Sequence, residues 1–73
     1  MVQERDIQKH VGARTRQFRK KLGVSQDVLA DMAGLHRAHV GAIERGERNV
    51  TLQTLKILAD TLGCKIVDLV KGL

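Results

Sequence analysis

VSQDVLADMAGLHRAHVGAIERGERN, the stretch from Val24 to Asn49, has the pattern of two short helices joined by one tight turn. Ser25 is a good N-cap because its hydroxyl can accept a hydrogen bond from an amide of the first turn, so a helix is predicted to begin near Gln26. Gly34 follows the last apolar residue of that helix, and glycine adopts the left-handed backbone conformation without steric cost. The stretch therefore predicts a helix, a glycine turn and a second helix.

The second helix of this stretch is predicted to have a thin apolar face. Val40 and Ile43 are its only large apolar residues. Small side chains at Ala38, Gly41 and Ala42 would let its backbone approach the major groove of B-DNA, which admits one helix. Two helices arranged in this way are the layout of a helix-turn-helix DNA reader. The alternative is that these alanines and glycines are simply the surface of a short helix.

Helical periodicity also precedes this stretch. Apolar residues and one threonine are spaced four, four, three and four apart, which predicts a first helix from about Asp6 to Leu22, with Gly23 beyond its end. These positions are Ile7, Val11, Thr15, Phe18 and Leu22. Phe18 is the only aromatic residue of the chain, so it is expected in the core, because a base-stacking platform normally needs several aromatic residues.

Two further helices are predicted after the central stretch. Thr51 is the predicted N-cap of a fourth helix that Gly63 closes, and residues 65–70 predict a short fifth helix. Proline is absent and no linker, repeat or low-complexity segment marks a second domain. The sequence therefore predicts one all-α domain of five helices over residues 1–73.

A set of residues between 23 and 63 occurs in a characteristic order and spacing without a gap, and the pattern as a whole runs from about 12 to about 69. The set is Gly23, Ser25, Gln26, Leu29, Ala30, Gly34, Leu35, Ile43, Glu44, Arg45, Gly46, Arg48, Asn49, Leu52, Leu55, Ala59, Leu62 and Gly63. In these residues the chain resembles the Cro/C1-type (Xre-like) helix-turn-helix family. The resemblance implies a compact lambda-repressor-like fold, with the helix-turn-helix at about 25–45, and a function as a sequence-specific transcriptional regulator. Within the family, the run LHRAHVGAIERGERNVTL is most similar to the small controller proteins of restriction-modification systems.

Four residues of the second helix are candidates for contact with base edges. Arg37 is the first, because its forked donors suit guanine N7 and O6 and because the matching position of the family commonly reads a base. Ala38 is expected to touch a thymine methyl group, and His39 and Ala42 are expected to lie close to the groove.

Five residues are candidates for contact with the DNA backbone: Gln26, Arg16, Arg45, Arg48 and Asn49. The net charge is +5, and basic residues predominate before Ser25, so the first helix is expected to attract a polyanion. At the start of a helix, a glutamine can hold a phosphate oxygen beside free backbone amides. The alternative is that the basic residues are a solvated helix face and that Asn49 only shapes a turn.

Glu44 should not face DNA, because phosphates repel a carboxylate. The family pattern pairs this glutamate with the arginine found here at Arg19, which implies a partly buried ion pair that ties the first helix to the third. Three residues depart from the family pattern: Val50 replaces a common proline, His36 replaces a stronger N-cap, and Thr15 replaces a larger aliphatic residue. These departures affect stability more than DNA reading.

The C-terminal segment is rich in apolar residues for its length. Ile66, Val67 and Val70 are the candidates for a dimer interface in a C-terminal helix at about 65–71, because so short a helix cannot bury all of its apolar residues. A second copy is the simplest partner, and two-fold dimers place two recognition helices on a palindromic operator. The alternative is that these residues only complete the core.

Composition limits the other functions. The lone Cys64 excludes an intramolecular disulfide, and no apolar run is long enough for a signal or membrane segment, so a cytoplasmic location without membrane contact is expected. His36 and His39 share a helix face but do not make a metal site, and 73 residues leave little room for a pocket. The sequence therefore predicts no enzyme, cofactor, metal or small-molecule ligand. Contact with RNA polymerase is compatible with the resemblance, and the alternative function is an antitoxin or small phage-type repressor whose C-terminal surface binds a protein.

Overall fold

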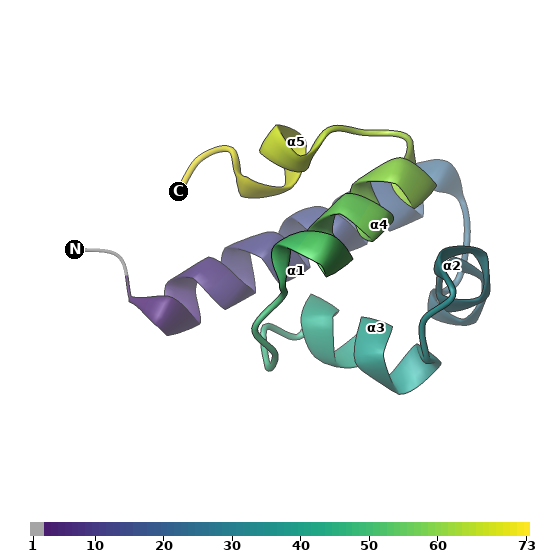
Figure 1. Ribbon diagram of the computed structural model, residues 1–73, viewed down its shortest axis with the longest axis horizontal. Coiled ribbons are helices and arrows are strands. Elements are labelled where there is room, and N and C mark those ends of the chain that lie inside the picture. The colour runs from purple at the N-terminus through teal and green to yellow at the C-terminus, as the bar shows by residue number, and fades with distance from the viewer. Residues whose placement is uncertain (1–2) are drawn as a thin grey trace.

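The computed structural model describes residues 3–73, apart from the side chains of residues 4 and 5. This part of the chain contains five helices and no strand (Figure 1). In chain order they are α1 (Glu4–Leu22), α2 (Gln26–Ala33), α3 (Arg37–Glu44), α4 (Leu52–Leu62) and α5 (Ile66–Val70). The predicted all-α fold with a central helix-turn-helix is thus confirmed. Of the predicted span 1–73, Met1 and Val2 lie outside the described residues.

Side-chain caps fix the start of two helices. The hydroxyl of Ser25 accepts a hydrogen bond from the amide of Val28 at 3.1 Å, and Thr51 caps α4 in the same way through the amide of Thr54, also at 3.1 Å. His36 makes no side-chain capping hydrogen bond at the start of α3, in keeping with its weak capping ability. These caps explain why the starts of α2 and α4 could be read from the sequence.

α1 begins two residues earlier than Asp6, where the sequence placed its start. Its N-cap, Gln3, has an extended backbone and no side-chain capping hydrogen bond, so the sequence carries no capping signal there. Apolar periodicity begins only at Ile7, which is 42% exposed. The end of the helix was predicted at the right residue because Gly23 follows it with φ = 81°, in the left-handed region.

All five helices contribute to one hydrophobic core. Its buried members are Val11, Leu29, Ala30, Val40, Ile43, Leu55, Leu58, Ala59, Leu62 and Leu69. Thr15 is fully buried beside them, and its hydroxyl donates a hydrogen bond to the Val11 carbonyl oxygen at 2.8 Å. Phe18 packs against the core as predicted, but Leu22 is 44% exposed. The predicted apolar face of α1 therefore reaches the core only through its middle.

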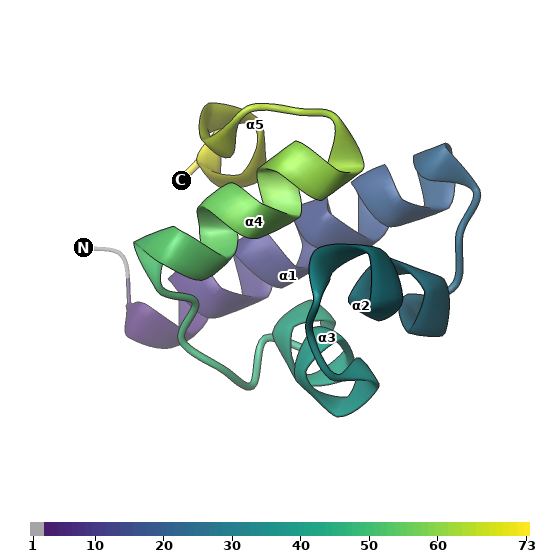
Figure 2. The same ribbon diagram turned by 45° about the vertical axis from the view of Figure 1, so that its right-hand side comes forward.

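α1 forms the centre of the arrangement and packs against α3, α4 and α5. α5 and α3 lie on opposite sides of α1 in both ribbon views (Figures 1 and 2). α2 packs against α3 and α4. The helix-turn-helix is therefore held on one side of the molecule, away from the C-terminal helix.

Gly12 lies where α1 crosses α3, and the two backbones are in close contact there. A Cβ atom on Gly12 would overlap the carbonyl oxygen of Ile43 and would lie 2.8 Å from that of Glu44. Gly46, just after α3, has φ = 73°, and a Cβ atom there would lie 2.8 Å from the Cα atom of Lys9. The absence of side chains at these two positions therefore sets how closely α3 approaches α1.

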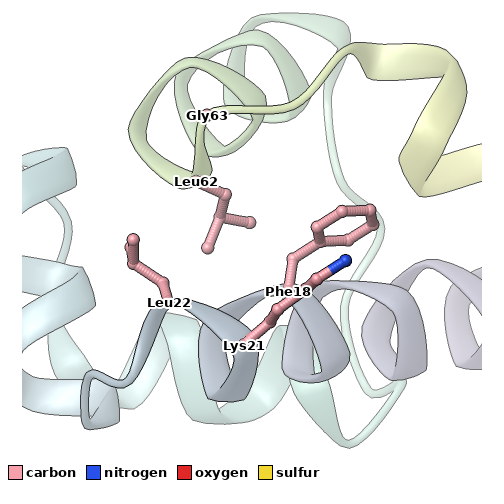
Figure 3. A pocket seen from close by; sticks show the side chains of 5 residues that line it. All are labelled: Phe18, Lys21, Leu22, Leu62 and Gly63. Atoms are coloured by element: carbon pink, nitrogen blue, oxygen red, sulfur yellow. The ribbon is translucent and has the colours of Figure 1, made fainter.

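A shallow pocket lies between the ends of α1 and α4 (Figure 3). The side chains of Phe18, Leu22 and Leu62 converge on it, and Lys21 lies beside Phe18. Gly63 completes the lining, so the pocket belongs to α1 and the end of α4. It is separate from the surface formed by α2 and α3.

Candidate nucleic-acid interface

α2 and α3 together form a shallow hollow on the surface. It is lined by Gln26 from the first turn of α2, by Arg37, Ala38 and Gly41 from α3, and by Arg45 just after α3. Small residues on α3 keep the floor of the hollow close to the helix backbone, and two arginines and an amide surround it. The surface combines a helix with small side chains, which can approach a DNA groove closely, with hydrogen-bond donors that suit phosphates and base edges.

The predicted base-contact residues differ in exposure. Arg37 and Ala38 are exposed on the first turn of α3, whereas His39 and Ala42 are half-buried. Burial, together with the positive charges of Arg48 and His36, lowers the pKa of His39 below its ordinary value. The shift disfavours the charged form of His39, while Arg37 carries a positive charge on the first turn of α3.

The predicted backbone-contact residues come from three parts of the chain. Arg16 is exposed on α1, and Gln26 begins α2. Arg45, Arg48 and Asn49 are exposed on the segment that joins α3 to α4. Of the five, the structure brings only Gln26 and Arg45 together in the hollow.

Arg45 and Asn49, on the segment after α3, each have a partner within the chain. The Nε atom of Arg45 lies 3.0 Å from a carboxylate oxygen of Glu47, and both side chains are well exposed. The side-chain oxygen of Asn49 accepts a hydrogen bond from Gln8 on α1 at 2.5 Å. Asn49 therefore links the segment after α3 to α1.

Arg19 and Glu44 form a buried ion pair that joins α1 to α3. The Nε atom of Arg19 donates to one carboxylate oxygen at 2.6 Å, and a terminal nitrogen donates to the other at 3.0 Å. The side chain of Glu44 is 2% exposed, so it does not face the solvent side of α3. The hydrogen bond to Glu44 raises the pKa of Arg19 above its ordinary value, against the opposing effect of burial.

Gln26 connects this ion pair to the hollow. Its side-chain amide donates a hydrogen bond to Glu44 at 3.0 Å, and Arg19 also donates to the carbonyl oxygen of Val24 at 2.9 Å. Because an amide group has two donor hydrogens, Gln26 keeps one for a ligand. The network fixes the start of α2 against the end of α3.

α5 exposes only part of its apolar surface. Leu69 is fully buried, and Ile66 and Val70 are half-buried and pack against the core of their own chain. Val67 is 55% exposed. Of the three predicted interface residues, Val67 therefore has the most surface left for a partner.

Two side chains of α1 hold α5 in place, and neither was predicted to do so. Arg14 Nε donates to the Asp68 carbonyl oxygen at 2.9 Å, and the guanidinium carbon lies 5.3 Å from the centre of the Phe18 ring. His10 Nε2 donates to the Lys71 carbonyl oxygen at 2.6 Å. Arg14 and Arg19 are among the basic residues before Ser25 that were expected to attract a polyanion, so two arginines of α1 instead support the fold.

Asp27 is a further residue that the sequence did not single out. Its carboxylate lies 3.2 Å from Nε of Arg37, and both side chains are largely exposed. Asp27 follows Gln26 in the first turn of α2, whereas Arg37 opens α3. The only hint in the sequence is an acidic residue beside a predicted DNA-contact residue.

No helix within residues 3–73 is long and apolar enough to cross a membrane. No group of three or more histidine, cysteine or acidic side chains comes together there in a way that could hold a metal ion.

The fold and the α2–α3 surface define a class of protein, the helix-turn-helix DNA-binding domain. A model of the helix-turn-helix family matches residues 16–69. The chain belongs to this family, in its Cro/C1-type branch, and is a DNA-binding regulator of transcription.

Relatives include proteins of restriction-modification systems. The chain is 44% identical over 64 residues to the control protein C.SmaI of Serratia marcescens. The aligned region covers 88% of this chain and 76% of that protein. The crystal structure of the restriction-modification controller protein C.AhdI from Aeromonas hydrophila is 40% identical, with a TM-score of 0.82 over 85% of this chain and 94% of that chain.

A repressor in complex with an operator has the same fold. The P22 c2 repressor in complex with a synthetic operator is 33% identical, with a TM-score of 0.79, over 86% of this chain and 96% of that chain. The similarity to a controller protein and to a repressor confirms the predicted class of transcriptional regulator.

Proposed function

We propose that the chain is a homodimeric controller protein that reads a palindromic operator, with α3 in the major groove. The observation that carries the proposal is the hollow between α2 and α3, which unites an exposed arginine, small residues and the start of a helix on one surface. The relatives named as controller proteins support the controller role. The proposed protein acts in the cytoplasm without a catalytic step or cofactor, and contact with RNA polymerase stays a prediction.

In the proposed complex, α3 supplies base contacts and its surroundings supply phosphate contacts. The guanidinium group of Arg37 pairs with guanine O6 and N7, and Ala38 lies against a thymine methyl group. His39 and Ala42 lie close to the groove wall. Gln26, Arg16, Arg45, Arg48 and Asn49 contact the backbone on either side, which fixes the register of α3 on the duplex.

The proposed dimer forms through the C-terminal helix. Val67 is exposed on α5, and Ile66 and Val70, the first and last residues of this helix, are half-buried. A two-fold dimer places the two α3 helices about one turn of DNA apart, roughly 34 Å, on a palindromic site. Autoregulation follows if that site lies upstream of the gene for this chain.

Arg37→Ala is expected to lose about 1–3 kcal/mol of discrimination between the operator and a variant with the contacted guanines replaced. Binding is measured by fluorescence anisotropy on duplexes that the wild type selects from a randomised pool. Arg48→Ala is the control, because loss of a phosphate contact weakens binding to both duplexes by a similar factor. A wild type that selects no sequence from the pool would contradict the proposed function.

Val67→Asp is expected to make the protein monomeric at concentrations where the wild type is a dimer, because the substitution puts a charge in an apolar interface. Sedimentation equilibrium measures the change. Met32→Asp is the matched control, since Met32 on α2 is 54% exposed and Val67 is 55% exposed. If both variants keep the wild-type mass, the interface lies elsewhere on the molecule.

A further inference from the structure

We propose that Asp27 is a positioning residue that sets the specificity of the α2–α3 surface by orienting the guanidinium group of Arg37. This inference rests on the proposed function, in which Arg37 reads guanine. The geometry that carries it is the contact between the Asp27 carboxylate and Nε of Arg37 at 3.2 Å.

The contact uses only one side of the guanidinium group. The Asp27 carboxylate lies within ion-pair distance of Nε, whereas the two terminal nitrogens carry four of the five guanidinium donors. These terminal nitrogens form the fork that matches guanine O6 and N7. Asp27 and guanine can therefore bind Arg37 at the same time, one from the protein side and one from the groove side.

A phosphate group and Asp27 do not contact Arg37 at the same time. The Arg37 side chain is 70% exposed, so it is free to swing toward the DNA backbone. A swing of that kind breaks the contact with Asp27 and leaves its carboxylate close to phosphates that repel it. Asp27 therefore favours the complex with guanine over a complex in which Arg37 contacts only phosphate.

Among the described residues, Asp27 is the carboxylate that pairs with Arg37. Arg45 lines the same hollow and adds a second positive charge. α3 has no acidic residue in its first turn, and His36 gives it no side-chain cap. An exposed ion pair between α2 and α3 can also stabilise the fold slightly. The test must separate this structural effect from the orientation of Arg37.

The experiment compares Asp27→Ala with Asp31→Ala. Asp31 is also exposed on α2 and carries the same charge, so both substitutions remove one acidic group from the same helix. Binding is measured by anisotropy over a range of salt concentrations, on the duplex selected by the wild type and on a scrambled duplex. The same substitutions are made in the Arg37→Ala background, and thermal unfolding is recorded for every variant.

Relative to Asp31→Ala, Asp27→Ala is expected to lose about threefold to fivefold in the ratio of operator to scrambled affinity, which is the scale of an exposed ion pair. Its salt dependence on scrambled DNA is expected to steepen by about one released counterion, since Arg37 becomes free to contact a phosphate. In the Arg37→Ala background, both differences are expected to vanish. A structural role alone would lower the unfolding temperature and would persist without Arg37.

Equal discrimination and equal salt dependence in Asp27→Ala and Asp31→Ala would overturn the role of Asp27 while leaving the proposed function standing. A difference that persists in the Arg37→Ala background would also overturn it, because Arg37 would not then carry the effect. A wild type that binds both duplexes equally would overturn the proposed function and this inference together.

Discussion

Glu44→Ala is expected to lower the free energy of unfolding by about 3–5 kcal/mol, the usual loss when one partner of a buried ion pair is removed. The Arg19 side chain, which is 11% exposed beside a Glu44 side chain that is 2% exposed, would keep its charge without a partner. The side-chain amide of Gln26 would lose the carboxylate that accepts its hydrogen bond. A domain of this size is expected to have a total stability of only about 4–11 kcal/mol. The variant should therefore lose a large part of its stability, which urea unfolding followed by circular dichroism would measure.

Glu47→Ala is the matched control for this prediction. Glu47 also pairs with an arginine, at 3.0 Å from Arg45, but the two side chains are 58% and 59% exposed. An exposed pair of this kind contributes only about 0–1 kcal/mol. Equal unfolding midpoints for Glu44→Ala and Glu47→Ala would show that burial gives the Arg19–Glu44 pair no special weight.

A double replacement tests whether the uncompensated charge causes the loss. In Arg19→Met with Glu44→Leu, neither side chain leaves a buried charge behind. The double variant is expected to be more stable than Glu44→Ala alone.

Gly12→Ala is expected to destabilise the fold by at least about 2 kcal/mol, because the added methyl group would press α1 away from α3. The new Cβ atom would overlap the carbonyl oxygen of Ile43 and lie 2.8 Å from that of Glu44, and neither backbone atom can move without shifting α3. In an open helix interior the same substitution stabilises by about 1 kcal/mol, since alanine favours the helix. Chemical unfolding measures the sign of the change directly.

Gly41→Ala is the control, because Gly41 also lies inside a helix. Its added Cβ atom would meet the end of the Arg45 side chain at 3.1 Å, and that flexible side chain can move aside. Gly41→Ala is therefore expected to leave stability unchanged or to raise it slightly. If Gly12→Ala stabilises the protein to the same extent, the close crossing of α1 and α3 does not limit the fold.

Local chemistry explains why so much of the fold could be predicted. The hydroxyls of Ser25 and Thr51 and the left-handed turn at Gly34 each act on the residues beside them, so the sequence alone shows where the helices begin and end. The start of α1 could not be placed as well, because Gln3 provides no capping hydrogen bond. The pairing of Arg19 with Glu44 came from the family resemblance, since nothing local links residues so far apart.

Contacts between distant residues account for what could not be predicted. Asp27 meets Arg37, and Arg14 and His10 meet backbone carbonyl groups of the C-terminal segment, only once the helices are packed. Gly12 could have been noticed as a glycine inside a predicted helix, where it costs stability unless packing needs it. Its partner on α3 depends on the crossing of two helices and has no signature in the sequence. The DNA-contact residues and the dimer interface stay predictions.

The Arg19–Glu44–Gln26 network has a consequence for how this protein can change over evolutionary time. The network joins α2 to α3 on the buried side of the α2–α3 surface. Ala38 is exposed on α3, and the ion pair of Arg37 with Asp27 is also exposed. Substitutions at Ala38 and Arg37 should therefore leave folding almost untouched. Under the proposed function, a lineage of such proteins acquires new operators by exchanging exposed residues of α3 one at a time on an unchanged scaffold.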